Sequence, residues 1–242
     1  MAGGGWVACH QDGDELRVKI CGITNSADAR VAAEAGADAI GLNFVGGPRQ
    51  IAVGVAAAIL ESLPPLVTPV VLVRLQDGRL SDELVGLLGR HRVSHLQIYG
   101  PVTAGALDAL AGDGFCPMPV IAVRGADFAR GAVLWRDCRA GRPRAVVLDT
   151  HDPLKEGGTG KVFHWELIPA AVASGAIRGW PPIILAGGLR PGNVAEAVHV
   201  VRPFAVDVSS GVEVEGSPGR KDATKVREFV LNARAAAGRL SV

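Results

Sequence analysis

The chain alternates between short apolar runs and longer amphipathic stretches. Runs rich in Val, Ile and Leu lie at 17–20, 39–44, 69–75, 94–99, 119–123, 144–149, 182–187 and 204–209. Nearly continuous apolar character is typical of parallel strands that are covered on both faces. Between the runs lie Ala-rich stretches whose apolar residues recur at helical spacing, such as 26–37, 81–91 and 193–201. The pattern therefore predicts eight strands, with helices between them.

The first of these helices carries recognisable end signals. Ser26 is of a type that caps a helix N-terminus, and Gly36 lies where a glycine commonly ends a helix. We therefore expect Ser26 to be the N-cap and Gly36 to lie just beyond the last turn.

Eight strand–helix units in 242 residues predict an α/β fold, a single closed (β/α)8 barrel. A doubly wound open sheet is the main alternative. It is disfavoured because the glycine-rich dinucleotide fingerprint is missing after the first strand, where 19–26 contains one glycine. We expect a flexible Gly-rich leader over 1–15, followed by one barrel domain over 16–242.

Charge and cysteine content narrow the functional class. The chain has 25 basic and 24 acidic side chains, distributed along its length, so nothing indicates a nucleic-acid or anionic-membrane surface. Its four cysteines, at 9, 21, 116 and 138, are widely spaced, which argues against a disulfide framework or a zinc site. With no secretory signal and no run of about 20 apolar residues, the sequence predicts a cytoplasmic protein without a metal.

In a (β/α)8 barrel, functional residues gather at the carboxyl ends of the strands and in the loops that follow. The polar side chains at these points of the predicted barrel are Cys21, Asn43, Arg49, Tyr99, Arg124, Asp149, Asp207, Ser209 and Ser210. These residues are therefore the candidates for an active site.

Three late loops are rich in glycine: 157–161, 186–193 and 207–213. Such loops can direct several backbone N–H groups at one anion, and phosphate binding after strands seven and eight recurs in this fold. The first loop, GGTGK, lacks the spacing of a Walker A motif. Three loops of like chemistry at one end predict a phosphate site whose residues are Gly158, Thr159, Gly160, Gly187, Gly188, Ser209, Ser210 and Gly211.

Cys21 and Asp149 each close an apolar run, VKIC and VVLD. A free cysteine is commonly a small buried hydrophobe, and this alternative stays open for Cys21. Asp149 is costly to bury unless it is paired, so it is a loop cap or a working group. A thiol that becomes a thiolate and a carboxyl that keeps its proton form a base and an acid suited to isomerisation.

The motifs KICGIT, ADAIGLNF, LQIYG, VVLDT, GGTGKVFHW, ILAGGLRPGNV and DVSSGVE…PGRKD occur in order between about residues 17 and 230. Together they resemble the phosphoribosylanthranilate isomerase family of tryptophan biosynthesis. The resemblance implies a (β/α)8 barrel that performs an Amadori rearrangement of a phosphoribosyl substrate without a cofactor. We expect the protein to be a monomer or homodimer. The family that shares this barrel in histidine biosynthesis works through paired aspartates, whereas the first strand here ends in cysteine.

The resemblance also implies roles for individual residues. Cys21 would be the general base at the sugar C2, and Asp149 the general acid at the ring oxygen. Arg49 would contact the anthranilate carboxylate, and Asp207 the sugar. Three motifs depart from the family pattern, with Gly47 before the proline of the second loop, Tyr99 in LQIYG and His164 in FHW. An isomerase for a different amine portion of the substrate, or a silent sugar-phosphate-binding barrel, are therefore the alternatives.

Overall fold

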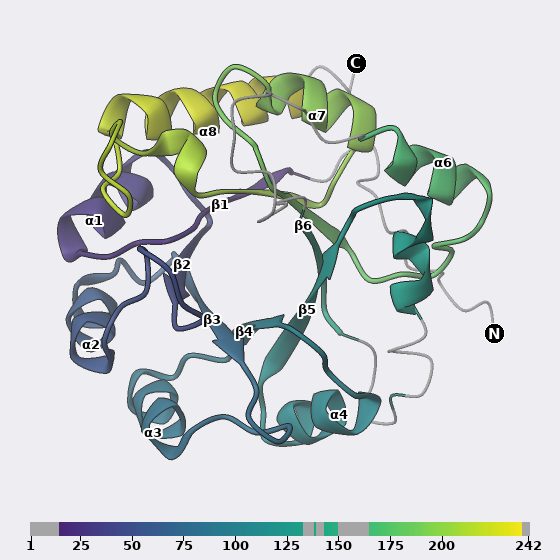
Figure 1. Cartoon of the computed structure of the whole chain (residues 1–242). Coiled ribbons are helices and arrows are strands. Elements are labelled where there is room, and N and C mark those ends of the chain that lie inside the picture. The colour runs from purple at the N-terminus through teal and green to yellow at the C-terminus, as the bar shows by residue number, and fades with distance from the viewer. Residues whose placement is uncertain (1–14, 133–137, 139–142, 150–164, 239–242) are drawn as a thin grey trace.

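The computed structural model describes residues 15–132, 138, 143–149 and 165–238. The predicted leader, apart from Glu15, and the loop with Gly158, Thr159, Gly160 and His164 lie outside the described residues. Eight parallel strands form a closed barrel in chain order. Figure 1 shows the barrel with the helices around it, and the pairing of β8 with β1 closes it. The strands are β1 (Arg17–Ile20), β2 (Ala39–Asn43), β3 (Thr68–Arg74), β4 (His95–Tyr99), β5 (Cys116–Ala122), β6 (Val146–Asp149), β7 (Ile183–Ala186) and β8 (Ala205–Val208).

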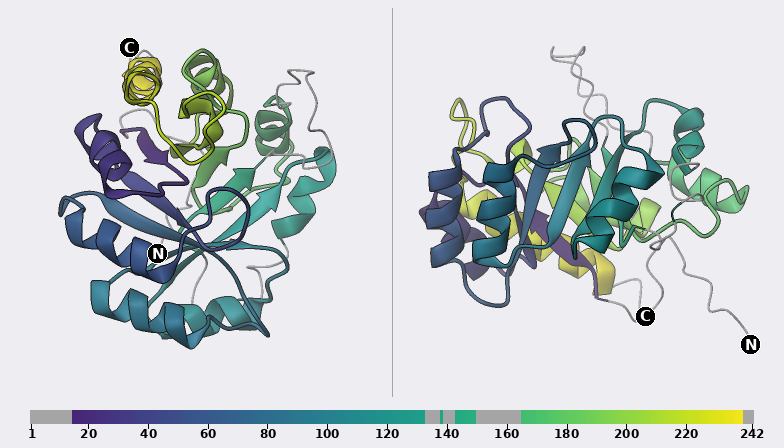
Figure 2. Two further views of the ribbon diagram at one scale, coloured as in Figure 1. Left: turned by 60° about the vertical axis from the view of Figure 1, so that its left-hand side comes forward. Right: turned by 90° about the horizontal axis from the view of Figure 1, so that it is seen from below.

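The helices surround this barrel, as the side views make clear (Figure 2). Within the described residues they are α1 (Ser26–Glu34), α2 (Val53–Ser62), α3 (Asp82–His91), α4 (Ala104–Gly112), α6 (Leu167–Ala173), α7 (Val194–Val201) and α8 (Ala223–Gly238). Two 3-10 helices, η1 (Ala126–Ala132) and η2 (Ser210–Val212), follow β5 and β8. The predicted barrel is thus confirmed, and its closure through the β8–β1 pairing excludes the open sheet.

The ends of α1 correct one expectation. Its N-cap is Asn25, whose side-chain oxygen accepts a hydrogen bond from the backbone N–H of Asp28, and Ser26 is the first helical residue. Both residue types cap helices well, so the sequence alone did not separate them. Gly36 lies beyond the C-cap Ala35 with a φ of 89°, as predicted for a residue that ends a helix.

Alternate residues of each strand face opposite sides of the barrel wall. The outward set is apolar and packs against the helices. Its members include Val18, Ile20, Ile40, Leu42, Val71, Val73, Leu96 and Ile98, all fully buried in one core with Ala32, Ile59, Leu87 and Phe229 of the helices. This layer is where most of the hydrophobic stabilisation of the barrel arises.

The inward set is divided. A separate apolar cluster, formed by Val70, Met118, Ala145, Val147, Ile184, Ala186 and Ala205, fills part of the interior. The same inward parity also places Lys19, Gln97 and Asp207 inside the barrel, and all three are buried. The interior therefore holds charges that the outer core does not.

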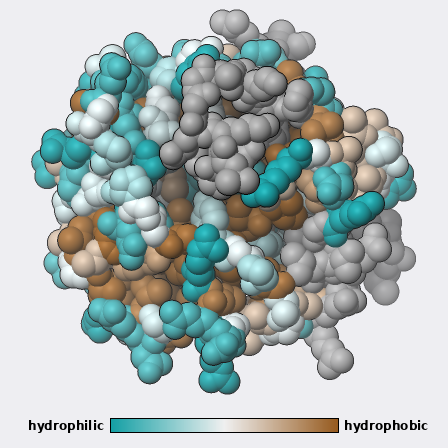
Figure 3. All heavy atoms as spheres, viewed as in Figure 1, coloured by the Kyte–Doolittle hydropathy of each residue, from teal (hydrophilic) through white to brown (hydrophobic). Residues whose placement is uncertain are grey.

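The surface seen from the direction of Figure 1 carries many hydrophilic side chains around the rim, with hydrophobic patches between them (Figure 3). Within the described residues, no helix has both the length and the apolar character that a bilayer crossing needs. The cytoplasmic location and the monomer or homodimer state stay predictions.

Candidate active site

Cys21 continues β1 by one residue. Its backbone N–H donates to the carbonyl of Val208 at 2.7 Å, so the β1–β8 pairing extends to this position. Side chains alternate along an extended strand, and Cys21 therefore shares the interior side of β1 with Lys19. Cys21 is 6% exposed, at the end of the strand where the loops of a (β/α)8 barrel build the site.

The thiol fits only because β2 carries a glycine beside it. A Cβ placed on Gly41 would lie 2.6 Å from Cys21 Sγ and 3.1 Å from Lys19 Nζ. Real side chains do not approach so closely, and the Cα of Cys21 is also 3.1 Å away, so the backbone leaves little room for relief. Gly41 thus provides the space in which the thiol and the ammonium lie.

Lys19 and Asp207 form a buried ion pair between the first and last strands. Lys19 Nζ lies 2.8 Å from Asp207 Oδ2, and both side chains are 5% exposed. Burial acts to lower the pKa of Lys19, but the charges of Asp207 and Cys21 and their hydrogen bonds outweigh it, so the pKa rises above its ordinary value. The ammonium is therefore charged at neutral pH.

Burial raises the pKa of Cys21, because a thiolate is poorly solvated inside the barrel. Lys19 is the strongest opposing influence, through its charge and a hydrogen bond, and Lys221 adds a weaker one. Asp207 acts in the other direction, since its carboxylate repels a thiolate. Burial likewise raises the pKa of the Asp207 carboxyl against the effect of Lys19.

Asp149 ends β6 and faces the interior beside Tyr99 of β4. The Tyr99 hydroxyl donates to Asp149 Oδ2 at 3.4 Å, and Gln97 Nε2 donates to the same hydroxyl at 3.0 Å. Burial, and then the negative charges of Cys21, Asp149 and Asp207, raise the pKa of Tyr99 far above its ordinary value. Tyr99 is therefore a neutral hydrogen-bond donor. Because Cys21, Asp149 and Asp207 all act on its hydroxyl, these three side chains lie around the same space in the barrel interior.

Arg49 of the loop after β2 is held by Glu213 of the loop after β8. Its Nε and Nη2 donate to the two carboxylate oxygens of Glu213, each at 2.7 Å, and Lys221 Nζ lies 3.0 Å from Glu213 Oε1. Burial works against the charge of Glu213, but the bonds from Arg49 and Lys221 are stronger, so its pKa lies below the ordinary value. The paired carboxylate fixes the guanidinium at the barrel mouth.

The loops after β7 and β8 lie against each other. A Cβ at Gly211 would overlap the carbonyl oxygen of Leu189, so a residue with a side chain does not fit there. Asn193 shapes the β7 loop, since its Oδ1 accepts from the Arg190 N–H and its amide donates to Gly188 O. The structure thus brings together two of the three predicted phosphate loops, with Gly187, Gly188, Ser209, Ser210 and Gly211.

The remaining strand-end candidates differ in position. The Asn43 side chain stabilises the loop that follows β2. Its Oδ1 accepts a hydrogen bond from the Val45 N–H, and its Nδ2 donates one to the carbonyl of Gly46. Arg124 is exposed. Among the described residues, no group of three or more His, Cys, Asp or Glu side chains is arranged to hold a metal ion.

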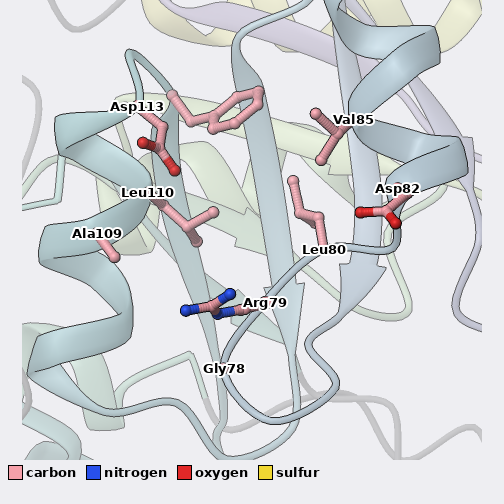
Figure 4. A pocket seen from close by; sticks show the side chains of 9 residues that line it. Gly78, Arg79, Leu80, Asp82, Val85, Ala109, Leu110 and Asp113 are labelled. Carbon is pink, nitrogen blue, oxygen red and sulfur yellow. The ribbon is translucent and has the colours of Figure 1, made fainter.

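A hollow of about 370 Å³ lies elsewhere, between α3 and α4 on the outside of the barrel (Figure 4). It is lined by Leu80, Val85, Leu110 and Phe115, together with Arg79, Asp82 and Asp113. None of these residues lies inside the barrel, so the hollow is separate from the polar interior.

Four residues of the site escaped the sequence reasoning: Lys19, Gln97, Glu213 and Lys221. Lys19 and Gln97 stand two positions before Cys21 and Tyr99, and the alternation of side chains along a strand was the signal that could have found them. Glu213 and Lys221 lie within the motif DVSSGVE…PGRKD, but no local pattern indicates that Glu213 binds both Arg49 and Lys221.

Comparison with known proteins identifies relatives for almost the whole chain. The family model described as "N-(5'phosphoribosyl)anthranilate (PRA) isomerase" matches residues 18–232. The N-(5'-phosphoribosyl)anthranilate isomerase of Trichlorobacter lovleyi is 42% identical over 223 residues, covering 91% of this chain and 99% of its own length. The enzyme of the same name from Azotobacter vinelandii is 43% identical over 222 residues, covering 90% of this chain and 98% of its own length.

Solved structures agree with these matches. Phosphoribosylanthranilate isomerase from Thermotoga maritima superposes with a TM-score of 0.76 at 33% identity, covering 91% of this chain and 99% of its own. Another phosphoribosylanthranilate isomerase structure superposes with a TM-score of 0.74 at 31% identity, with the same coverage of both chains. That structure is a complex with reduced 1-(o-carboxyphenylamino)-1-deoxyribulose 5-phosphate. The chain belongs to the N-(5'-phosphoribosyl)anthranilate isomerase family and is an isomerase enzyme of this kind.

Proposed function

We propose that the chain converts N-(5-phosphoribosyl)anthranilate into 1-(2-carboxyphenylamino)-1-deoxyribulose 5-phosphate, as a step of tryptophan biosynthesis. The observation that carries the proposal is the meeting of a thiol and a carboxyl around one interior space. Cys21 follows β1 and Asp149 ends β6; the Tyr99 hydroxyl donates to Asp149, and the charges of Cys21 and Asp149 both raise the pKa of Tyr99. An acid and a base on opposite sides of a sugar are what an aldose–ketose isomerisation needs.

In the proposed reaction, Asp149 gives its proton to the ring oxygen while the C1–O bond breaks, and the nitrogen lone pair forms a C1=N⁺ bond. The Cys21 thiolate then removes the proton from C2, the C–H electron pair forms C1=C2, and the nitrogen recovers its lone pair. The resulting enolamine gains a proton at C1 and loses the proton of its C2 hydroxyl, which gives the ketone. No atom or electron is gained or lost overall, so the proposed steps need only the acid and the base.

Binding of the substrate is assigned to the groups around this pair. Arg49 retains N–H donors beyond the two that Glu213 accepts, and these are assigned to the anthranilate carboxylate. Asp207 Oδ1 is buried without a hydrogen-bond partner among the described residues, which suits a sugar hydroxyl. The backbone of Gly158–Gly160, Gly187–Gly188 and Ser209–Gly211 is assigned to the phosphate.

The loss of phosphoribosylanthranilate fluorescence tests the assignment. We expect turnover by the wild-type chain, and a decrease in kcat of about 10²–10⁴-fold in Cys21→Ala and in Asp149→Ala. Cys116→Ala is the matched control, because Cys116 begins β5 and lies outside the proposed machinery. Absence of wild-type turnover would reject the function, and an unimpaired Asp149→Ala would reject its role as the acid.

The amine portion of the substrate is tested through Arg49. A substrate made with aniline in place of anthranilate lacks the carboxylate. We expect Arg49→Met to raise the KM for the anthranilate compound about tenfold or more and to leave the KM for the aniline compound unchanged. Equal effects on both substrates would place the contact of Arg49 elsewhere and would favour an isomerase for a different amine.

A further inference from the structure

Lys19 is a buried cation next to Cys21 that the reaction above does not use. The two side chains are separated by Ile20 on β1 and point into the same space, where both border Gly41. The neighbouring strand β8 contributes Asp207, whose carboxylate oxygen lies 2.8 Å from Lys19 Nζ. A cation, an anion and a thiol therefore meet at the junction of the first and last strands.

A purely structural role explains this pair poorly. Removing two charges from water is costly, and apolar residues of similar volume often stabilise a protein as well or better. Here the hydrogen bonding is incomplete, because Asp207 Oδ1 has no partner among the described residues. A buried pair with an unsatisfied oxygen contributes little stability, yet it occupies the position beside the proposed base.

We propose that Lys19 is a positioning residue for Cys21: its ammonium stabilises the negative charge of the thiolate, while Asp207 holds the ammonium in place and limits that effect. The inference rests on the proposed function, in which Cys21 is the base. When the thiol ionises, its proton leaves to solvent, and the ammonium remains between two anions.

The other titratable groups that act on Cys21 come from several elements. Among the described residues they are Asp207 of β8, Lys221 beyond β8, Arg49 of the loop after β2 and Tyr99 of β4. Arg49 and Lys221 are both bound to Glu213, and the effect of Lys221 on the thiol is weaker than that of Lys19. Lys19 is thus the dominant cation facing the thiol in the described part of the chain.

Substitution of Lys19 and substitution of Asp207 are expected to shift the pKa of Cys21 in opposite directions. Without the ammonium, the thiolate loses its principal stabilising charge, so the pKa of Cys21 should rise in Lys19→Met. Without the carboxylate, the ammonium acts on the thiol unopposed, so the pKa should fall in Asp207→Asn. A general disturbance of the fold would not move the pKa in opposite directions.

The measurement is the pH dependence of Cys21 alkylation by iodoacetamide, which reacts with the thiolate. Mass spectrometry of the peptide that contains Cys21 separates its rate from those of the other cysteines in the full chain. At a pH below both midpoints we expect Cys21 of Lys19→Met to react at least about tenfold more slowly than wild type, a shift of one pKa unit. Lys19→Arg should restore much of the rate, because it restores the charge.

A control and a second variant protect the result. Arg227→Met removes an exposed cation of α8, which packs on the outside of the barrel, and its Cys21 midpoint should equal that of wild type. Lys19→Met leaves Asp207 buried without its cation and can fail to fold, which circular dichroism and thermal unfolding reveal. The neutral double variant Lys19→Met/Asp207→Asn avoids this, and its midpoint should lie between those of wild type and Lys19→Met.

Midpoints that do not move, or that move in the same direction in Lys19→Met and Asp207→Asn, would overturn the proposal. The alkylation measurement is independent of catalysis, because it needs no substrate. Full turnover by Cys21→Ala would instead reject Cys21 as the base, whatever the alkylation midpoints are. In turnover, the acid limb of kcat/KM should move to higher pH in Lys19→Met, which a merely structural role of the lysine would not produce.

Discussion

The two sides of the barrel wall are built from the same strands but follow different rules. The outward side chains, such as Leu96 and Ile98 of β4, are apolar and fully buried against helices. Their inward neighbours on β4, Gln97 and Tyr99, are polar and hydrogen-bonded to each other. The outward side supplies the hydrophobic stabilisation, whereas the inward side near the strand ends carries the charges that chemistry needs. Stability and activity should therefore respond to different substitutions only one residue apart.

The largest expected effect is on stability, from the outward side. Leu96→Ala empties a fully buried position and should reduce the free energy of unfolding by about 2–5 kcal/mol. The folded variant should keep its kcat within about twofold, because Leu96 faces away from the interior. Urea unfolding and turnover by the same preparation check both statements. A large loss of kcat in fully folded protein would contradict the separation of the two sides.

Next comes the inward position that holds the thiol. In Gly41→Ala, the new methyl group would lie 2.6 Å from Cys21 Sγ, so the thiol must move. A misplacement of about 1 Å at a reacting group can lower the rate about 100-fold, and we expect a loss of this order in kcat/KM.

Gly54→Ala is the matched control for Gly41→Ala. Gly54 is exposed in α2, and a Cβ there meets nothing within 4 Å. This variant should have wild-type activity and gain about 0.5–1 kcal/mol of stability, because alanine is the better helix residue. Equal activity of the two alanine variants would show that Gly41 does not confine the thiol.

A smaller effect is expected at the mouth of the barrel. Glu213→Gln loses the charge that holds the Arg49 guanidinium, and KM should rise about tenfold while kcat changes less, as for a lost hydrogen bond between charged groups. Steady-state kinetics with the phosphoribosyl substrate separate the two parameters. A change confined to kcat would indicate that Glu213 acts on the reaction itself.

The Glu213 carboxylate should also make the stability of the folded protein depend on pH. Because its pKa is lowered in the folded protein, the stabilisation is fully present above the ordinary carboxyl pKa of about 4.3 and is lost as the pH falls below that value and through the lower pKa of the folded state. Thermal unfolding followed from about pH 6 down to about pH 3 should therefore show a shallower decline in Glu213→Gln than in wild type. An identical pH dependence would mean that Glu213 is not ionised in its pair.

The smallest effect is expected at Tyr99. Its hydroxyl is 3.4 Å from Asp149 Oδ2, a long hydrogen bond, so Tyr99→Phe should lower kcat about threefold, or roughly 0.7 kcal/mol. Turnover of the phosphoribosyl substrate checks the value. A loss above about 100-fold would mean that the Tyr99 proton itself takes part in the reaction.

The fold could be predicted from the sequence because apolar residues occupy both faces of most strands. The outward side chains and the inward apolar cluster together make nearly continuous apolar runs along the chain. The prediction was least accurate at β5, which begins at Cys116 rather than 119. Pro117 lies in the missed part of this strand and lacks an N–H for the ladder, so the sequence disfavours a strand over 116–118. In the barrel, tertiary packing overrides that local signal.

The site was less accessible. Cys21 and Asp149 stand out because each interrupts an apolar run at its end. Lys19 does not, since a lysine near the start of a chain is ordinarily read as an exposed residue. The pairing of Arg49 with Glu213 joins residues 164 positions apart, and only the closed barrel brings them together. Contacts of this kind depend on topology, which no local pattern encodes.

The Lys19–Asp207 pair also sets a condition on how the chain is made. Its partners lie 188 residues apart, one on the first strand and one on the last. A ribosome adding roughly 5–20 residues per second needs about 10–40 s to synthesise the chain between them. During that time the lysine has no counter-ion from β8, and water is a better environment for it than a half-built barrel. The charge beside the thiol can therefore be enclosed only at the final stage of synthesis, when the eighth strand arrives.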